Sequence, residues 1–499
     1  MLNGKLLVLV VVSVAVFLVG LDMTVLYTAL PIITHELQAS NSDKMWIVNA
    51  YPLVMAGLVL GVGTVADRVG HRPVLLAGLV VFGLASIVAA FAPSVSVLIV
   101  GRVLLAVGAA MILPASLALL RHLFETDQER AIAIGVWGAM FSGAAAIGPI
   151  VGGVLLNNFW WGSVFLMNVP VVLVALVCSV IMIKHTPGNP DRSWDLVSSA
   201  QVMVGLVGIT YGLEELTKPE INALHAMTAA TIGIISLTSF VRRQKRSNDP
   251  IVDFTLFRSS QFMGGVLSII VSMIAFIGVQ LVMTQQLQLV EGFSPLKAGL
   301  CIVPISLAAF CAGPLVGSVL HRIGAIRVLW SSLVLGAIGL VGVAVFAGDF
   351  FALQLVSLGV FGFGAASGMT SASSIIMLST PDEKAGMAAS IEAVFYEFSS
   401  VLGVVVMGGI ATFSYTSNLI VPHDIANASI AKDSLDQALI LAQSLSADTA
   451  SQLIADAKAA FNQAYFNVLV ASAALMLVLA GVLATLFSSN EVVPHQVIE

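Results

Sequence analysis

The chain has 499 residues, of which 58% are hydrophobic and only 10% are charged. A soluble globular domain carries about 25% charged residues, so the composition excludes one and predicts an all-α polytopic membrane protein. The formal net charge of -6 therefore says little about a partner, and nucleic acid is not expected as one. All three cysteines lie in apolar runs, which gives no indication of a disulfide framework or a metal site.

Apolar runs of about 20 residues are predicted to be spanning helices, because a bilayer core about 30 Å thick requires that length at about 1.5 Å per residue. The first run lacks a small-residue cleavage site and is interpreted as an uncleaved first helix. Fourteen spans are predicted, at residues 5–30, 45–66, 73–92, 95–119, 131–155, 161–183, 196–215, 223–241, 260–284, 296–320, 326–346, 350–376, 386–411 and 464–486.

Lysine and arginine are distributed unevenly between the segments that join these spans. With the N-terminus inside, fifteen of the 21 lie on the inner side, five on the outer side, and one, Arg102, lies within a span. The outer segments contain no arginine. This positive-inside bias predicts a multi-pass membrane protein with both termini in the cytoplasm.

A short charged turn between the second and third spans recurs in the second half of the chain. The frame that begins at Gly63 recurs from Gly317, 254 residues later, and Glu129-Arg130-Ala131 matches Glu383-Lys384-Ala385 at the same offset. Two matches at one offset indicate an internal duplication, which in a membrane protein is typical of a transporter whose site lies between the halves.

The duplication predicts a six-helix bundle over 1–190 and another over 259–499, with an inserted helix pair and a basic loop over 191–258. Residues 412–463 are predicted to be a long outer loop. Apolar residues at helical spacing in this loop indicate amphipathic helices across the outer mouth, although a tolerated surface excursion explains the length as well. The basic run 242–246 is interpreted as an orientation signal at the lipid headgroups rather than a regulatory site.

Ionisable side chains within the predicted spans are few, and each is a candidate functional residue because a charge there costs at least ~2.5–3.5 kcal/mol. Asp22 and Arg102 lie at similar depths and could form an ion pair. That pair either locks two helices together or prepares Asp22 to load and release protons. Glu392 and Glu397 are candidate cavity acids, with Tyr396 on the face of Glu392, and pairing between helices is the alternative.

The fifth span contains a glycine-rich run, Gly143-Ala-Ala-Ala-Ile-Gly148-Pro149-Ile-Val-Gly152-Gly153. Small residues allow close approach of helices and Pro149 removes a backbone donor, so the run suits a helix that slides or hinges; plain packing is the alternative. Further polar and aromatic residues suit a cavity wall, although each also fits interface packing: Trp46, Asn49, Tyr51, Gln280, Gln285 and Gln286.

Motifs of common enzyme classes are absent from the sequence. It contains no phosphate-binding Gly-x-x-x-x-Gly-Lys-[Ser/Thr] loop, no His-Glu-x-x-His and no Gly-x-Ser-x-Gly. We therefore expect a transporter rather than an enzyme. Without an ATP-binding module, uphill transport must use an ion gradient, and we expect no bound cofactor.

These segments together resemble the Major Facilitator Superfamily, and within it the fourteen-helix drug:proton antiporters of the QacA/SmvA type. The turn from Gly63 to Arg72 is similar to the superfamily signature, and Arg102 with Gly108 is similar to a helix-four motif associated with proton coupling. The run from Gly143 to Gly153 resembles the antiporter motif of helix five. The resemblance covers nearly the whole chain and includes three more segments: Leu21–Pro31, Trp46–Tyr51 and Phe165–Pro170.

This resemblance implies the major facilitator fold and multidrug efflux by alternating access, in which protons compete with a lipophilic cation such as a quaternary ammonium compound or a dye. It implies that Asp22 and the acids Glu392 and Glu397 bind protons or cations, with Arg102 beside Asp22. It also implies a conformational latch on the cytoplasmic side, formed by Gly63, Asp67, Arg68, Gly70, Arg72 and Arg130.

One departure from the family pattern concerns the substrate. Exporters of dications tend to add acids in helix two and paired acids in helix thirteen, whereas this chain has Asn49 in the former and Ala393 after Glu392. Monovalent organic cations are therefore the expected substrates, and we expect the transporter to be a monomer in the lipid bilayer. A dedicated exporter of a single metabolite is the alternative function.

Overall fold

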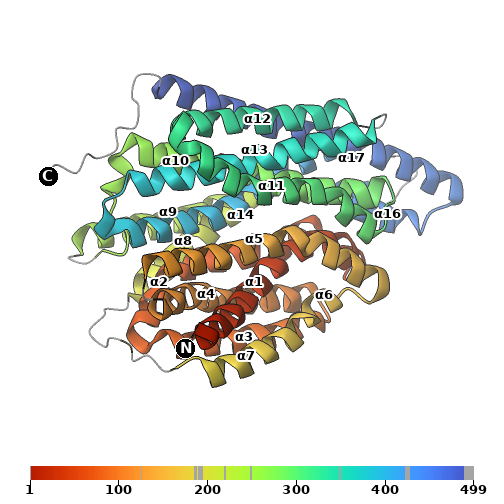
Figure 1. Ribbon diagram of the computed structural model, residues 1–499. Coiled ribbons are helices and arrows are strands. Elements are labelled where there is room, and N and C mark those ends of the chain that lie inside the picture. Colours follow the sequence, from red (N-terminus) through yellow and green to blue (C-terminus); the bar gives the residue numbers. More distant parts are fainter. Residues whose placement is uncertain are drawn as a thin grey trace. The chain divides into compact units, whose positions relative to one another are not determined.

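The computed structural model describes residues 2–124, 126–184, 188, 195–218, 221–247, 250–347, 350–421 and 428–487, and every regular element within them is a helix (Figure 1). The first nine helices are α1 (Leu2–Glu36), α2 (Asn41–Val69), α3 (His71–Ala90), α4 (Val95–Leu123), α5 (Asp127–Asn158), α6 (Ser163–Leu166), α7 (Asn168–Met182), α8 (Leu196–Glu215) and α9 (Ala223–Arg246). The later ones are η1 (Leu256–Arg258), α10 (Ser260–Gln285), η2 (Gln286–Val290), α11 (Pro295–Ile323), α12 (Ala325–Val345), α13 (Phe351–Leu378), η3 (Asp382–Lys384), α14 (Ala385–Asn418), α15 (Ala428–Asp433), α16 (Leu435–Ala442) and α17 (Ala447–Leu486).

The predicted all-α polytopic architecture is confirmed. Among the described residues, twelve helices are long and apolar enough to cross a membrane, and α2 is a thirteenth if its two bent halves form one span. A further helix, α8, occupies the remaining predicted range and ends in the acids Glu214 and Glu215. The described residues therefore give twelve spans by this measure, thirteen if α2 is one bent span, and fourteen if α8 also crosses.

Two compact units make up the chain. Unit 1 consists of Met1–Gly212, Met227–Phe240 and Leu287–Leu300, and within it α1 packs on α5, α3 on α4, and α2 on α4. Unit 2 consists of Leu213–Ala226, Val241–Gln286 and Cys301–Glu499. Within unit 2, α12 lies beside α13 and α17, and α10 packs on α13 and α14 (Figure 1).

The duplicated turn has the same backbone geometry in both copies. Gly70 separates α2 from α3 with φ 106°, and Gly324 separates α11 from α12 with φ 93°. Each glycine donates its N–H to the carbonyl oxygen four residues earlier, at 2.9 Å. Only glycine adopts such a positive φ without steric cost, so the repeated frame encodes the same helix end twice.

The second helix is bent between Val59 and Gly61, by 54°. Glycines and prolines are the usual causes of a sharp kink, and α2 contains Pro52, Gly57 and Gly61 near this point. A Cβ on Gly61 would overlap the Ser199 hydroxyl of α8, so the bend lies where α8 approaches α2 closely.

The segment between the last two long helices is shorter than the loop predicted over 412–463, because α14 ends at Asn418 and α17 begins at Ala447. The last helix, α17, begins at Ala447 rather than near 464, after the capping residue Ser446, and its 40 residues extend about 60 Å, twice the thickness of the bilayer core. The predicted amphipathic helices are present in the described part of this segment: α16 buries Leu435, Ala438 and Ala442, and the first turns of α17 bury Leu453, Ala457 and Phe461 among polar residues. Their position across the outer mouth stays a prediction. Tyr415 Oη of α14 donates to the Ala431 carbonyl at 3.0 Å and so ties α15 to α14.

Candidate functional site

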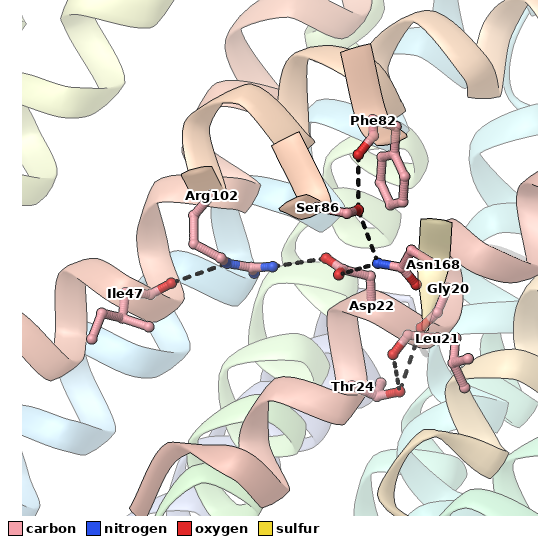
Figure 2. Close-up of polar contacts among 9 residues, drawn as sticks. All are labelled: Gly20, Leu21, Asp22, Thr24, Ile47, Phe82, Ser86, Arg102 and Asn168. Atoms are coloured by element: carbon pink, nitrogen blue, oxygen red, sulfur yellow. Dashed lines mark hydrogen bonds and ion pairs between the residues drawn. The ribbon is translucent and has the colours of Figure 1, made fainter. Parts of the chain in front are cut away.

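A buried acid on α1, Asp22, contacts side chains from two other helices (Figure 2). Arg102 Nη1 of α4 lies 2.8 Å from Asp22 Oδ2, and Asn168 Nδ2, at the start of α7, donates to Oδ1 at 3.1 Å. Asp22 is 0% exposed and Arg102 is 2% exposed. The predicted ion pair between these two residues is therefore confirmed.

The far side of the arginine is held by α2. Arg102 Nε donates to the Ile47 carbonyl at 3.2 Å. The guanidinium carbon lies 4.6 Å from the centre of the Tyr51 ring, which is a cation–π geometry. Tyr51, predicted as a cavity-wall residue with interface packing as the alternative, thus packs on one member of the ion pair.

The amide partner is held in turn by α3. Asn168 Nδ2 lies 3.3 Å from Ser86 Oγ, and the Ser86 hydroxyl donates to the Phe82 carbonyl at 2.8 Å (Figure 2). The network around Asp22 therefore draws on five helices of unit 1: α1, α2, α3, α4 and α7.

A buried ion pair is stable only when good geometry and further hydrogen bonds repay the loss of solvation of both charges. Asp22 and Arg102 meet both conditions, because each makes a second contact besides their own. A proton added to Asp22 would remove the charge that balances Arg102. The network is thus built so that one protonation event changes the electrostatic balance at the junction of several helices.

Small residues bring α5 close to α1, within two turns of Asp22. A Cβ added to Gly148 would overlap the Thr24 hydroxyl and lie 3.0 Å from its Cβ, and one added to Gly152 would lie 3.2 Å from a Val25 methyl group. On α1 itself, a Cβ on Gly20 would lie 2.7 Å from the Phe141 carbonyl oxygen. The glycines of the predicted antiporter run therefore determine how closely these two helices pack.

The other residues of that run differ in their surroundings. Gly143 has no atom within 4 Å of the position of an added Cβ. A Cβ on Gly153 would lie 2.5 Å from the Leu296 Cα of α11, and the Pro149 carbonyl faces Gly299 of the same helix. Gly143 thus serves no close contact, whereas Gly153 and Pro149 contact the start of α11, which also belongs to unit 1.

The acids predicted in the thirteenth span lie on α14, in unit 2. Glu392 is buried and has Ser373 of α13 as a hydrogen-bonding neighbour. Glu397 is half-buried, and its Oε2 atom is buried without a hydrogen bond to any part of the chain that the structure describes. Tyr396 is half-buried, and Gln280 of α10 is buried. Unlike Asp22, neither acid has an ion pair with a basic residue among those described.

Two of the predicted cavity-wall residues of α2 have different surroundings. The Trp46 ring lies 6.2 Å from the Tyr211 ring of α8, which fits the packing alternative. Asn49 is fully buried, and neither side-chain atom has a hydrogen-bond partner within the described segments. A buried amide is costly unless its polar atoms are satisfied, so Asn49 is the α2 residue that best suits contact with water or a polar ligand.

The turn between α2 and α3 holds the predicted latch. Asp67 Oδ1 lies 3.7 Å from His71 Nε2, which forms an ion pair only when His71 is protonated. Within the described residues Asp67 has no ion pair with Arg68 or Arg72. Arg72 Nη2 instead donates to the Val180 carbonyl at the end of α7, at 2.8 Å. The His71 ring stacks on His122 of α4, with 5.4 Å between the ring centres, so this turn is fixed to α4 and α7.

Comparison with known proteins establishes the family. Residues 12–404 match the family described as Major Facilitator Superfamily. The chain belongs to this superfamily. It is 35% identical over 479 residues to the methyl viologen resistance protein SmvA of Salmonella typhimurium, and the alignment covers 95% of this chain and 96% of that protein. It is 34% identical over 482 residues to the multidrug efflux pump LfrA of Mycolicibacterium smegmatis, with 96% and 95% covered.

Solved structures agree with the major facilitator fold. A bacterial homologue of the human lysosomal transporter Spinster, in an inward-facing and unoccupied conformation, aligns with a TM-score of 0.68 at 14% sequence identity, over 97% of this chain and 98% of that one. Together with the family match, this likeness makes the chain a membrane transporter rather than an enzyme.

Three members of this transporter's ion-pair network were not identified as site residues from the sequence: Ile47, Ser86 and Asn168. Asn168 offered a signal, because an amide side chain in the apolar run 161–183 must find a partner when buried. The Ile47 carbonyl offered none, since a backbone oxygen contacts whatever the packing of helices brings to it.

Proposed function

We propose that this major facilitator transporter exports lipophilic organic cations in exchange for protons, by alternating access. In this proposal it acts as a monomer in the cytoplasmic membrane, with both termini in the cytoplasm. The buried network of Asp22, Arg102 and Asn168 is the observation that carries the proposal.

Proton coupling requires an acid whose charge state changes the stability of one conformation relative to another. Ionised Asp22 balances the charge of Arg102 and accepts a hydrogen bond from Asn168. Protonated Asp22 carries no charge to balance Arg102, and its oxygens are weaker hydrogen-bond acceptors. Because five helices supply the network, its rearrangement provides a route from proton binding to helix movement. The small-residue contact between α1 and α5 lies nearby and allows such movement with little bulk in the way.

The direction of transport and the broad substrate class follow from the relatives. LfrA is named a multidrug efflux pump and SmvA a methyl viologen resistance protein, and each is similar to this chain over at least 95% of its own length. Cationic substrates fit the acids Glu392 and Glu397 of α14. An ionised carboxylate without a counter-charge is costly within a membrane, and either a proton or an organic cation relieves that cost. Competition between the two produces exchange.

The sequence and the relatives favour different charges for the substrate. Asn49 and the single acid at 392 favour monovalent cations, as argued from the sequence. The name of the relative SmvA favours the opposite, because methyl viologen is a dication. We therefore propose monovalent quaternary ammonium compounds and dyes as substrates, and include a dication in the test.

The decisive experiment measures ethidium export in proteoliposomes under an imposed pH gradient, with and without an uncoupler. Wild-type protein should export ethidium only with the gradient, other monovalent lipophilic cations should inhibit, and methyl viologen should inhibit weakly. Asp22→Asn should abolish this export, and Gly143→Ala is its control, because the new methyl group meets no atom within 4 Å. No ethidium movement by correctly folded protein would refute the proposal and favour a dedicated exporter of a single metabolite.

A further inference from the structure

The segment between α9 and α10 folds back on the end of α9. Gln244, buried in the last turn of α9, accepts a hydrogen bond from the Ile251 N–H through its Oε1 atom, at 2.8 Å. Asp253 Oδ2 lies 2.7 Å from Lys384 Nζ, and the Asp253 N–H points to the Met387 sulfur at 3.0 Å. These residues all belong to unit 2, so the segment is fixed both to α9 and to the turn before α14.

This arrangement encloses a pocket of about 500 Å³. Ligand pockets in proteins commonly have volumes of about 300–1,000 Å³, so it has room for a small polar group. The polar residues that line it are Gln244, Lys245, Ser247, Asp253, Thr255 and Arg258.

The pocket has an excess of positive charge. Lys245 and Arg258 are exposed, and neither forms an ion pair with any described residue. The acid of the lining, Asp253, is already engaged: the hydrogen bond from Lys384 is the main reason that its pKa is lowered to about 2. The lining also includes the hydroxyl group of Ser247, whereas the hydroxyl group of Thr255 is hydrogen-bonded to Asp253. Two cations with hydroxyl donors are the usual chemistry of a phosphate site.

The pocket lies at a membrane boundary. It is formed where α9, a spanning helix, ends and before α10, the next spanning helix, begins. The distribution of lysine and arginine predicts that this boundary is the cytoplasmic one, where acidic phospholipids attract basic segments.

We propose that this pocket binds a phosphate-bearing anion between Lys245 and Arg258, with the headgroup of an acidic phospholipid as its occupant. The same phosphate chemistry is available from soluble phosphates, and the experiment separates the two sources. The basic run at the end of α9 then has two parts: Lys245 faces the pocket, whereas Arg242 and Arg246 lie outside its lining.

The test is native mass spectrometry of the full-length protein in detergent, with phosphatidylglycerol or phosphatidylcholine added at equal concentration. The pocket variant is Lys245→Gln with Arg258→Gln, and the control is Arg242→Gln with Arg246→Gln, which removes the same number of positive charges from the end of α9 but none from the pocket lining. Wild type and control should retain phosphatidylglycerol in preference to phosphatidylcholine. The pocket variant should bind it about thirtyfold more weakly, given about 1 kcal/mol for each basic residue.

Competition with glycerol 3-phosphate identifies the source of the phosphate. Retention of phosphatidylglycerol against millimolar glycerol 3-phosphate supports the lipid as occupant, whereas displacement supports a phosphate site that soluble anions fill. Equal losses in the two variants, or no preference for phosphatidylglycerol and no binding of glycerol 3-phosphate, would overturn the proposal. Because binding is measured without transport, this result is independent of the proposed export activity.

Discussion

Removing one charge of the Asp22–Arg102 pair should lower the free energy of unfolding far more than removing both charges. Arg102→Gln leaves a carboxylate that is 0% exposed, and Asp22→Asn leaves a guanidinium that is 2% exposed. Loss of one partner from a buried pair costs about 3–5 kcal/mol. At about 1.4 kcal/mol per tenfold, each single variant should change the unfolding equilibrium by roughly two to four powers of ten.

The double variant Asp22→Asn/Arg102→Gln contains no buried charge at this position. Its asparagine still offers an oxygen to the Asn168 amide, which donates at 3.1 Å in the wild type. The double variant should therefore recover most of the stability that each single variant loses, and the cycle should give a coupling energy of at least about 2 kcal/mol. Unfolding in mixed micelles by titration with SDS measures the free energies.

Transport by the same variants separates a structural lock from a proton site. If the pair only locks α1 to α4, the double variant should regain both stability and gradient-driven export. If Asp22 carries protons, the double variant should regain stability alone. Asp22→Glu, which keeps a carboxyl group, should then retain part of the export. Wild-type export by the double variant would refute the proton role, and a coupling energy near zero would refute the electrostatic argument itself.

Three further predictions follow from other contacts. Gly148→Ala should destabilise the protein by about 1–3 kcal/mol, because its methyl group would overlap a threonine side chain of α1, whereas Gly143→Ala should stay within about 0.5 kcal/mol in the same SDS titration. Asp67→Asn should shift the balance between conformations by about 1.5- to fivefold in a spin-label distance measurement, since the Asp67 side chain is 49% exposed and exposed ion pairs contribute about 0.2–1 kcal/mol. A wild-type distribution of distances would count against the latch. The link between Asp253 and Lys384 should keep constant strength from pH 8 to pH 5 and weaken below about pH 4. The folded-state pKa of Asp253 is lowered to about 2, so the link adds stability at any pH above the unfolded-state pKa, and this stability is lost as the pH falls toward 2. Hydrogen exchange of residues 250–259, corrected for intrinsic rates, measures it, and a step near neutral pH would contradict the prediction.

The spans and the duplicated turn could be predicted because their causes are local. A run of about 20 apolar residues is sufficient to specify a spanning helix, and the duplicated frame repeats the glycine, Gly70 or Gly324, that ends one with a positive φ. The length of α17 could not be predicted in this way. Its first turns are polar, so hydropathy places the beginning of the span near 464. The helix itself begins at Ala447, after the capping residue Ser446.

The candidate site shows the same limit. Depth along a helix predicted that Asp22 and Arg102 could meet, because two spans of known direction fix the height of each side chain. Rotation about each helix axis is set by packing, which the sequence does not state. The contact of the Tyr51 ring with Arg102 and that of Asp67 with His71 therefore could not be predicted from the sequence.

The duplication repeats the scaffold but not the charges. At the offset of 254 residues, Asp22 corresponds to Phe276, whose ring lies 6.2 Å from Phe361, and Glu397 corresponds to Gly143, which serves no close contact. Each unit therefore has acids where the other has apolar or small residues. The acid of unit 1 has a counter-charge and fixed hydrogen bonds, whereas Glu397 of unit 2 has no ion pair among the described residues. An acid with a built-in counter-ion suits exchange of a small ion such as a proton, because a bulky cation would have to displace Arg102. An acid without one is open to a substrate cation, so the two units are suited to different halves of the proposed exchange.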